Sequence, residues 1–165
     1  MAAPGRFDAR ELFVTLTRHD VDYVTIGGIA IQAHGGQRLT QDLDIAIAAS
    51  RENLERLARA LADLDARILG PEGQQSRRPP SAALLGGSEI WHLITAHGPL
   101  DVVTLPAHLG SFEELRARAH TTPLGDLTIP IASRDDLIAM KRTTGRPQDL
   151  ADVRLLESLA DENPT

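Results

Sequence analysis

The sequence predicts an α+β fold, in which a small mixed β-sheet is flanked by helices and the C-terminal third is helical. Three observations predict it. Short apolar segments with strand-like alternation recur along residues 21–131, each bounded by glycine, proline or other turn-forming residues. Segments with apolar residues at helical spacing separate these strands, and residues 133–160 carry helix signals alone. We therefore expect a single domain over residues 1–165, with its core at 21–131 and C-terminal helices at 133–160.

The N-terminal part predicts helix, strand, helix and strand in that order. Residues 7–18 carry apolar side chains at the spacing of a helix, and residues 21–26 form an apolar strand that ends at a glycine pair. Residues 29–34 follow as a short helix, which a second glycine pair ends. Residues 43–48 are the second strand.

The middle of the chain predicts a helix, a long loop and a hairpin. Ser50 is a good helix N-cap, and leucines at helical spacing follow it as far as Leu64. Residues 71–83 have no apolar period and are rich in Pro, Gly and polar residues, so we expect a mobile loop or lid there. Residues 88–96 and 100–105 are two strands joined by a His-Gly-Pro turn, which predicts a hairpin.

The last part predicts a helix, a strand and two further helices. Residues 112–119 are the helix, and residues 124–131 are the strand, with a Gly-Asp turn signal at its start. Ser133 caps a helix that runs to about Thr144, where a glycine ends it. Pro147 opens the last helix at the position that proline favours.

Length, composition and charge narrow the class of protein. The 165 residues are enough to bury a sizeable core, and the chain has no cysteine, which excludes disulfides and thiolate metal sites. No apolar segment approaches the roughly 20 residues that span a bilayer, so we expect a cytoplasmic protein that contacts no membrane. The net charge of −6 argues against bulk DNA or RNA binding, but not against an enzyme that touches a nucleotide and one RNA end.

Asp42 and Asp44 stand at the start of the second strand, where they alternate with apolar residues. Side chains two apart on a strand leave the same face, separated by about 6–7 Å. Carboxylates held in this way repel each other and suit a hard divalent cation such as Mg²⁺, completed by water and phosphates. The alternative is a solvated strand face, but Asp is a poor strand former, so a pair of them indicates a use. We predict that both are metal ligands.

Asp101 is the natural third carboxylate. It begins an apolar strand that could pair beside residues 43–47. Three acids of this kind can hold two metal ions that clamp the attacking and leaving oxygens of a displacement. The alternative is that Asp101 only caps the turn at Gly98 and Pro99.

Two motifs resemble a known family. The run Ile26-Gly-Gly-Ile-Ala, followed by Arg38-x-Thr-x-Asp-x-Asp, resembles the minimal nucleotidyltransferases of the polymerase β superfamily. The tail Lys141-Arg-Thr-Thr-Gly-Arg-Pro-Gln-Asp-Leu-Ala-Asp is similar to the C-terminal motif of the AbiEii-type branch, known as toxins of type IV toxin–antitoxin and abortive-infection systems. The resemblance covers most of residues 21–156. It implies the nucleotidyltransferase fold and transfer of a nucleoside monophosphate from an NTP, in some members to tRNA 3′ ends.

The resemblance also implies roles for residues near the second strand. Gly27 and Gly28 match the turn that holds the triphosphate. Arg38 and Thr40 stand in the same motif, and we assign them to substrate binding. The pair at Asp42 and Asp44 matches the metal ligands, and Asp101 matches the acid that activates the attacking hydroxyl.

In the tail, Lys141 matches a basic residue near the triphosphate, while Asp149 and Asp152 match the final acidic pair of the substrate site. The residues alone permit a plainer interpretation. The two acids share one face of the last helix, so they can favour its N-terminus and pair with Lys141 or Arg146. Lys141 by itself could be an ordinary solvated lysine.

The first hypothesis is therefore an AbiEii-like toxin that needs Mg²⁺ or Mn²⁺ and moves an NMP from an NTP to an acceptor hydroxyl, with an RNA or tRNA 3′ end as acceptor and a cognate antitoxin as partner. The alternative is a catalytically weak protein of the same fold that binds a nucleotide or a partner protein, because Gly28 stands where many superfamily members have serine. A metal nuclease is a third interpretation.

Other motifs add little. Arg77 and Arg78 in the long loop could clamp a phosphate or an RNA backbone, although such pairs are more often solubilising features. The six histidines show no zinc spacing, so we expect most to be structural or on the surface. The chain has no P-loop, Gly-x-Ser-x-Gly or Gly-x-Gly-x-x-Gly motif.

Overall fold

In the computed structural model, which describes residues 6–162, one mixed seven-stranded sheet forms the centre of the molecule. Its strands are β1 (Tyr23–Ile26), β2 (Leu43–Ile47), β3 (Arg67–Ile68), β4 (Ile90–Thr95), β5 (Gly98–Val103), β6 (His120–Leu124) and β7 (Leu127–Ile131). Their order across the sheet is β3-β4-β5-β2-β1-β7-β6. β2 pairs antiparallel with β1 and parallel with β5, so strands of both directions meet at the centre. The predicted fold class is confirmed.

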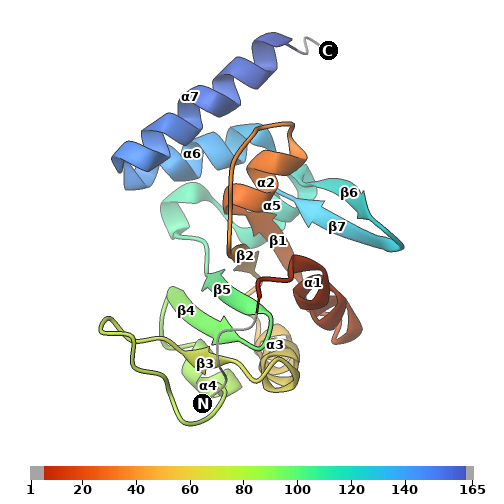
Figure 1. Cartoon of the computed structure of the whole chain (residues 1–165), viewed down its shortest axis with the longest axis vertical. Coiled ribbons are helices and arrows are strands. Elements are labelled where there is room, and N and C mark those ends of the chain that lie inside the picture. The colour runs from red at the N-terminus through yellow and green to blue at the C-terminus, as the bar shows by residue number, and fades with distance from the viewer. Residues whose placement is uncertain (1–5, 163–165) are drawn as a thin grey trace.

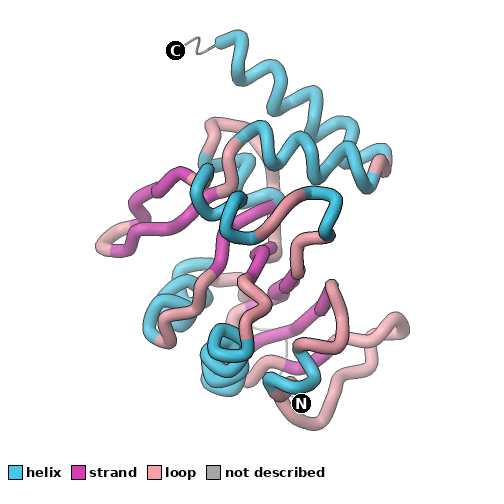
Figure 2. Tube along the Cα trace, turned by 180° about the vertical axis from the view of Figure 1, so that it is seen from behind, coloured by secondary structure: helices cyan, strands magenta, loops and turns pink. Residues whose placement is uncertain are grey.

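Helices surround this sheet (Figure 1). They are α1 (Ala9–Arg18), α2 (Gly27–Ala33), α3 (Arg51–Asp63), α4 (Ala82–Leu85), the 3₁₀ turn η1 (Ala107–Leu109), α5 (Phe112–Arg118), α6 (Arg134–Thr144) and α7 (Pro147–Glu162). Figures 1 and 2 show α6 and α7 packed together at one end of the molecule, with α3 and α4 toward the other. No helix in the described part of the chain is both long and apolar enough to cross a membrane.

The two faces of β2 differ, and this difference positions the site. Leu43, Ile45 and Ile47 are at most 2 % exposed and belong to the hydrophobic core. Helices α1 and α3, which pack on each other, contribute to the same core with their buried leucines. Because successive strand side chains leave opposite faces, Asp44 points to the side away from these residues.

Buried Asn53 fixes α3 against the ends of the two central strands. Its side-chain oxygen accepts from the Asp22 backbone N–H at 2.7 Å, and its amide nitrogen donates to the carbonyl oxygens of Asp22 and Ala48 at 2.9 and 2.7 Å. A buried amide that satisfies three backbone groups holds a strand end in one position. The carboxylate-bearing strand is therefore anchored at its far end.

Several predicted helix boundaries are confirmed by their caps. The hydroxyls of Ser50 and Ser133 accept the backbone N–H groups of the third residues of α3 and α6. Gly145, at φ 61°, ends α6 in the left-handed conformation that glycine adopts without strain, and Pro147 is the first residue of α7.

The prediction of one strand over residues 124–131 is wrong. Leu124 ends β6, the Gly-Asp pair makes the turn, and β7 begins at Leu127. The missed strand, β6, is the edge of the sheet, and its sequence His-Thr-Thr-Pro-Leu has no apolar alternation. Proline is tolerated on an edge strand because no further strand lies beyond it to require an N–H donor.

The long loop predicted at residues 71–83 is shorter than expected. Leu69 and Gln75 form an isolated bridge, the Ser76 hydroxyl accepts the Ile68 N–H at 2.9 Å, and α4 begins at Ala82. In Figure 1 this segment lies beside β3, at the edge of the sheet. A role as a lid stays a prediction.

Candidate active site

Three carboxylates converge at the centre of the sheet. Asp42 directly precedes β2, Asp44 lies in β2, and Asp101 is the residue of β5 that pairs with Asp44 in the parallel register. One carboxylate oxygen from each residue lies within 4.8 Å of the other two. In the part of the chain that the structure describes, this is the one cluster of three such residues that could hold a metal ion. We call it the acid triad.

The three carboxylates of the triad repel one another. Burial raises the pKa of Asp44, the charges of Asp42 and Asp101 and a hydrogen bond with Asp101 raise it further, and Lys141 lowers it, for a pKa of about 7. Burial and the two neighbouring acids thus both favour the protonated form of Asp44. A divalent cation bound to the same oxygens would replace that proton and neutralise the repulsion.

The glycine pair lies directly against the triad. Gly27 has φ +71°, and a Cβ atom there would come 2.1 Å from Asp44 Oδ2. A Cβ atom on Gly28 would come 2.9 Å from the Cβ of Thr40. Both positions need glycine because the backbone turn must approach β2 and the preceding loop closely.

Thr40 fixes Asp42. Its hydroxyl oxygen lies 3.0 Å from Asp42 Oδ1 and 3.1 Å from the Asp42 carbonyl oxygen, so it can donate to either. With Oδ1 held in this way, Oδ2 of Asp42 has no partner among these contacts and can bind a cation.

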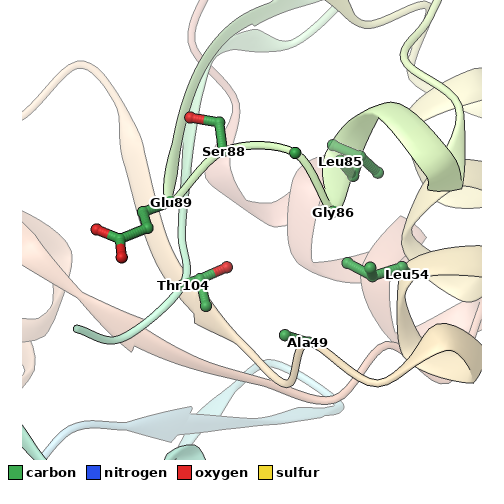
Figure 3. A pocket seen from close by; sticks show the side chains of 8 residues that line it. Ala49, Leu54, Leu85, Gly86, Ser88, Glu89 and Thr104 are labelled. Atoms are coloured by element: carbon green, nitrogen blue, oxygen red, sulfur yellow. The ribbon is translucent and has the colours of Figure 1, made fainter. Parts of the chain in front are cut away.

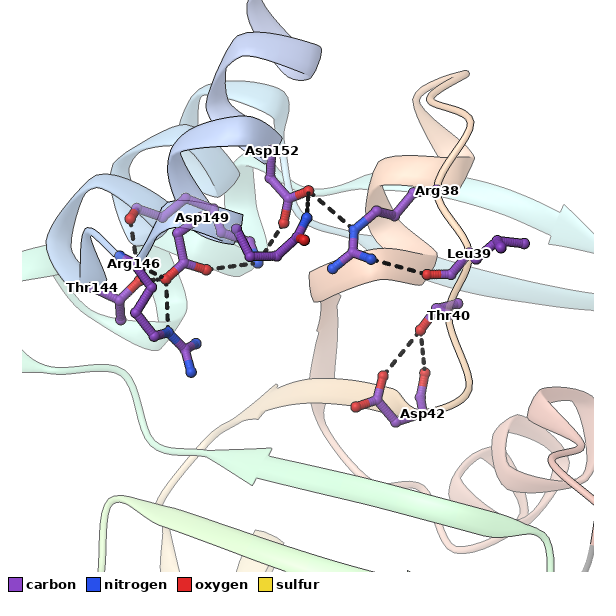
Figure 4. Close-up of polar contacts among 10 residues, drawn as sticks. Arg38, Leu39, Thr40, Asp42, Thr144, Arg146, Asp149 and Asp152 are labelled. Atoms are coloured by element: carbon purple, nitrogen blue, oxygen red, sulfur yellow. Dashed lines mark hydrogen bonds and ion pairs between the residues drawn. The ribbon is translucent and has the colours of Figure 1, made fainter.

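The remaining predicted site residues, Arg38, Lys141, Asp149 and Asp152, form a second group together with Arg146 (Figure 4). We call these five residues the C-terminal cluster. The two acids are at most 2 % exposed. Lys141 Nζ lies 3.3 Å from Asp149 Oδ1 and 3.1 Å from Asp152 Oδ2, the latter an ion pair without hydrogen-bond geometry. Arg38 donates from Nε to Asp152 Oδ1 at 3.0 Å and so ties the loop before β2 to α7.

Burial tends to raise the pKa of Asp149, but the opposing interactions are stronger. Hydrogen bonds from Thr144, Arg146 and Lys141 and the charge of Lys141 bring this pKa down to about 2. The Thr144 hydroxyl donates to Asp149 Oδ2 at 2.7 Å, and Arg146 Nε donates to the same oxygen at 2.9 Å. Unlike Asp44, this carboxylate is stabilised in its charged form.

His92 is a further residue beside the triad, and no local sequence pattern indicates it. This side chain of β4 is the cross-strand partner of Asp101, and its Nδ1 lies 2.9 Å from Asp101 Oδ1. The hairpin turn pairs Thr95 with Gly98, and counting back from this pair reaches the same partner. The position of His92 opposite Asp101 thus follows from the sequence once the register of the hairpin is fixed.

A separate hollow of about 230 Å³ does not involve the triad (Figure 3). Its lining includes Ala49, which follows β2, and Thr104, which follows β5. It therefore lies beyond the C-terminal ends of these strands, whereas Asp44 is near the start of β2. None of the predicted site residues lines it.

The donor set of the triad fits a divalent cation. Three carboxylates with their oxygens close together are hard ligands of the kind that Mg²⁺ and Mn²⁺ bind. Thr40 and His92 hold one oxygen each of Asp42 and Asp101, as residues behind metal ligands commonly do.

The family model described as "Nucleotidyl transferase AbiEii toxin, Type IV TA system" matches residues 19–165. The chain belongs to the AbiEii nucleotidyl transferase family. This family match spans both the acid triad and the C-terminal cluster. No curated protein matches the chain in a sequence search.

Solved structures of nucleotidyltransferases share the fold. The crystal structure of ANT(2″)-Ia in complex with adenylyl-2″-tobramycin is 14% identical, covers 93% of this chain and 88% of its own, and superposes with a TM-score of 0.58. The lincosamide antibiotic adenylyltransferase LnuA, bound to lincomycin, is 19% identical with 94% and 99% coverage and a TM-score of 0.59. A nucleotidyltransferase-like protein from Paracoccidioides brasiliensis is 16% identical with 94% and 78% coverage and a TM-score of 0.56. This AbiEii-family chain is thus a nucleotidyltransferase by family and by fold.

Proposed function

We propose that this chain transfers a nucleoside monophosphate from an NTP to an acceptor hydroxyl in a reaction that depends on Mg²⁺ or Mn²⁺. The observation that carries this proposal is the acid triad: three mutually repelling carboxylates from the start of β2 and from β5, with oxygens within 4.8 Å of one another. Such a cluster is costly to a folded protein unless a cation uses it. Asp42, Asp44 and Asp101 are the proposed ligands.

In the reaction, the acceptor oxygen forms a bond to the α-phosphorus of the NTP, the bond from that phosphorus to the bridging oxygen breaks, and pyrophosphate leaves. The acceptor hydroxyl gives up its proton. Asp101, whose side chain is 25% exposed at the edge of the triad, orients the acceptor hydroxyl or accepts its proton. When bound, the cation supplies neutralisation of phosphate charge and orientation of the triphosphate.

The remaining residues position the nucleotide. Gly27 and Gly28 let the backbone approach the triphosphate, and Thr40 holds Asp42. The C-terminal cluster supplies positive charge that reaches the triad from Lys141. Catalysis of this kind comes from positioning and charge neutralisation rather than covalent chemistry.

The acceptor that we propose is an RNA 3′ end, in the manner of a toxin neutralised by a cognate antitoxin in the cytoplasm. The toxin and type IV toxin–antitoxin description of the matched family supports this role. Growth arrest on expression, relieved by an adjacent gene product, is the result expected. Growth unaffected by the active protein would contradict the toxin role and leave the proposed nucleotidyl transfer unaffected.

Incubation with Mg²⁺, each α-labelled NTP and total RNA tests the chemistry. We expect labelled RNA with the natural chain and loss of the label with Asp42→Ala and Asp44→Asn. Asp126→Asn is the matched control, because Asp126 is an exposed carboxylate paired with Arg10 and remote in the sheet from the triad.

Other outcomes would redirect the proposal. Label on small hydroxyl compounds but not on RNA would replace the acceptor. NTP binding without turnover on any acceptor would favour the catalytically weak binding protein, for which Gly28 in place of serine is the motivating residue. Shortened RNA without label would indicate a nuclease.

A further inference from the structure

The C-terminal cluster presents its positive charge unevenly. It holds three cations against two buried carboxylates, so one positive charge is in excess. The side chains of Lys141 and Arg38 are 19% and 30% exposed, whereas that of Arg146 is 75% exposed. The excess charge therefore faces solvent at Arg146.

Lys141 is engaged on two sides. Its Nζ lies within 3.3 Å of Asp149 and within 3.1 Å of Asp152, and its ammonium group has only three donors. Two carboxylates balance its charge. A lysine held in this way stabilises a nearby triphosphate mainly through its electrostatic field. Its ammonium group has little freedom to move toward a phosphate oxygen.

Arg146 has the opposite arrangement. Its Nε donates to Asp149 Oδ2 at 2.9 Å, and its backbone N–H reaches the same oxygen at 3.3 Å. Within the described residues, its two terminal nitrogens make no hydrogen bond or ion pair. Figure 4 shows the guanidinium extending from the α6–α7 turn with its terminal nitrogens free.

This guanidinium is also within electrostatic reach of the acid triad. The hydrogen bond to Asp149 and the charge of Asp149 raise the pKa of Arg146, and the charge of Asp44 adds to the rise. A cation anchored at one edge, with a free planar fork directed outward, has the geometry for bidentate contact with a phosphate.

We propose that Arg146 binds the β- and γ-phosphate oxygens of the NTP through its two terminal nitrogens, and that Asp149 and Lys141 position it. This inference rests on the proposed function, since it names a contact within the same nucleotide site. It assigns triphosphate recognition to the turn between α6 and α7 rather than to Lys141 directly.

Calorimetric titration with Mn²⁺ and a non-hydrolysable NTP, and separately with the corresponding nucleoside monophosphate, tests the proposal. We expect Arg146→Ala to weaken NTP binding by about tenfold or more, the usual size of a charge-assisted contact, while monophosphate binding changes less than about twofold. Arg146→Lys should recover part of the NTP affinity, because it restores the charge without the fork. Thermal unfolding of each variant should stay close to that of the natural chain.

Arg142→Ala is the matched control. Arg142 is also an exposed arginine, at the end of α6, but it pairs with Glu157 of α7. Its loss should leave both affinities unchanged.

Two results would overturn the inference alone: equal NTP affinity in Arg146→Ala and the natural chain, or equal loss of NTP and monophosphate affinity together with a lower unfolding temperature. A natural chain that binds no NTP would overturn the proposed function, and this inference with it.

Discussion

The acid triad and the C-terminal cluster both gather aspartates, but they do so under opposite electrostatic conditions. In the triad, burial and the charges of two other acids raise the pKa of Asp44 to about 7. In the cluster, Asp149 receives donors from Thr144, Lys141 and Arg146, and its pKa falls to about 2 despite its burial. In the triad the carboxylates repel one another, whereas in the C-terminal cluster they are paired with cations.

The difference separates two uses of a buried carboxylate. A cluster whose carboxylates are all paired with cations holds helices and loops in place, since Arg38 links the loop before β2 to Asp152 of α7 and Lys141 links α6 to α7. A cluster of like charges without cations costs stability until a cation binds it, so selection for folding alone does not explain the triad.

Asp149→Asn should lower the free energy of unfolding by about 3 kcal/mol, because it leaves the buried side of Lys141 without a full counter-charge. Urea denaturation measures this change. Asp101→Asn in the triad should keep or raise the stability of the metal-free protein, since it removes a like charge. A loss of similar size in both variants would contradict the contrast.

Gly27→Ala should cost about 1–3 kcal/mol of stability and abolish Mn²⁺ binding. The residue has φ +71°, and its new Cβ atom would meet Asp44 Oδ2 at 2.1 Å. Circular dichroism melts and Mn²⁺ titration measure the two effects. Unchanged Mn²⁺ affinity would mean that the turn does not lie against the ligand. Gly145→Ala is a control, because Gly145 also has positive φ but has only an Arg142 backbone oxygen, at 3.7 Å, beside its missing Cβ.

The two groups should give stability opposite slopes with pH. The pKa of Asp44 rises from 3.8 to about 7 on folding, so the folded, metal-free chain binds the extra proton between these values. Its stability should therefore fall as the pH rises from about 4 to 7, by up to about 1.4 kcal/mol per pH unit. The pKa of Asp149 is lowered to about 2, so its contribution is lost as the pH falls from about 4 toward 2.

Urea unfolding with a chelator present, measured across this pH range, tests both slopes. Asp44→Asn should flatten the upper slope, and Asp149→Asn the lower one. Stability that rises between pH 4 and 7 in the natural chain, with no change in Asp44→Asn, would contradict the assignment for the triad.

His92→Ala should have the smallest effect on stability, within about 0.5 kcal/mol, because the side chain is 62% exposed. It should weaken Mn²⁺ binding by up to about tenfold, since it removes a partner that orients Asp101. His92→Asn should recover part of that affinity by donating to the same oxygen. Mn²⁺ affinity equal to that of the natural chain in His92→Ala would make the contact incidental.

Much of the fold could be predicted because its signals are local. The serine caps at Ser50 and Ser133 and the glycine that ends α6 act within one helical turn, so they can be read without knowledge of the rest of the chain. The strand at Asp42 and Asp44 is predicted by the alternation of these acids with apolar residues. Edge strand β6 has no such signal, because only its pairing with β7 makes it a strand.

For the candidate site too, local sequence patterns determined one part and tertiary contacts the other. By itself, the sequence determined that two aspartates stand two residues apart at the start of a strand, that glycines precede them, and that a third acid lies in another strand. Only the tertiary structure decided that β5 lies parallel to β2 with Asp101 beside Asp44, that His92 joins them, and that Arg146 rather than Lys141 has free donors. The physical reason is that alternation and capping act between near neighbours in the chain, whereas register and charge balance depend on residues that meet only after folding.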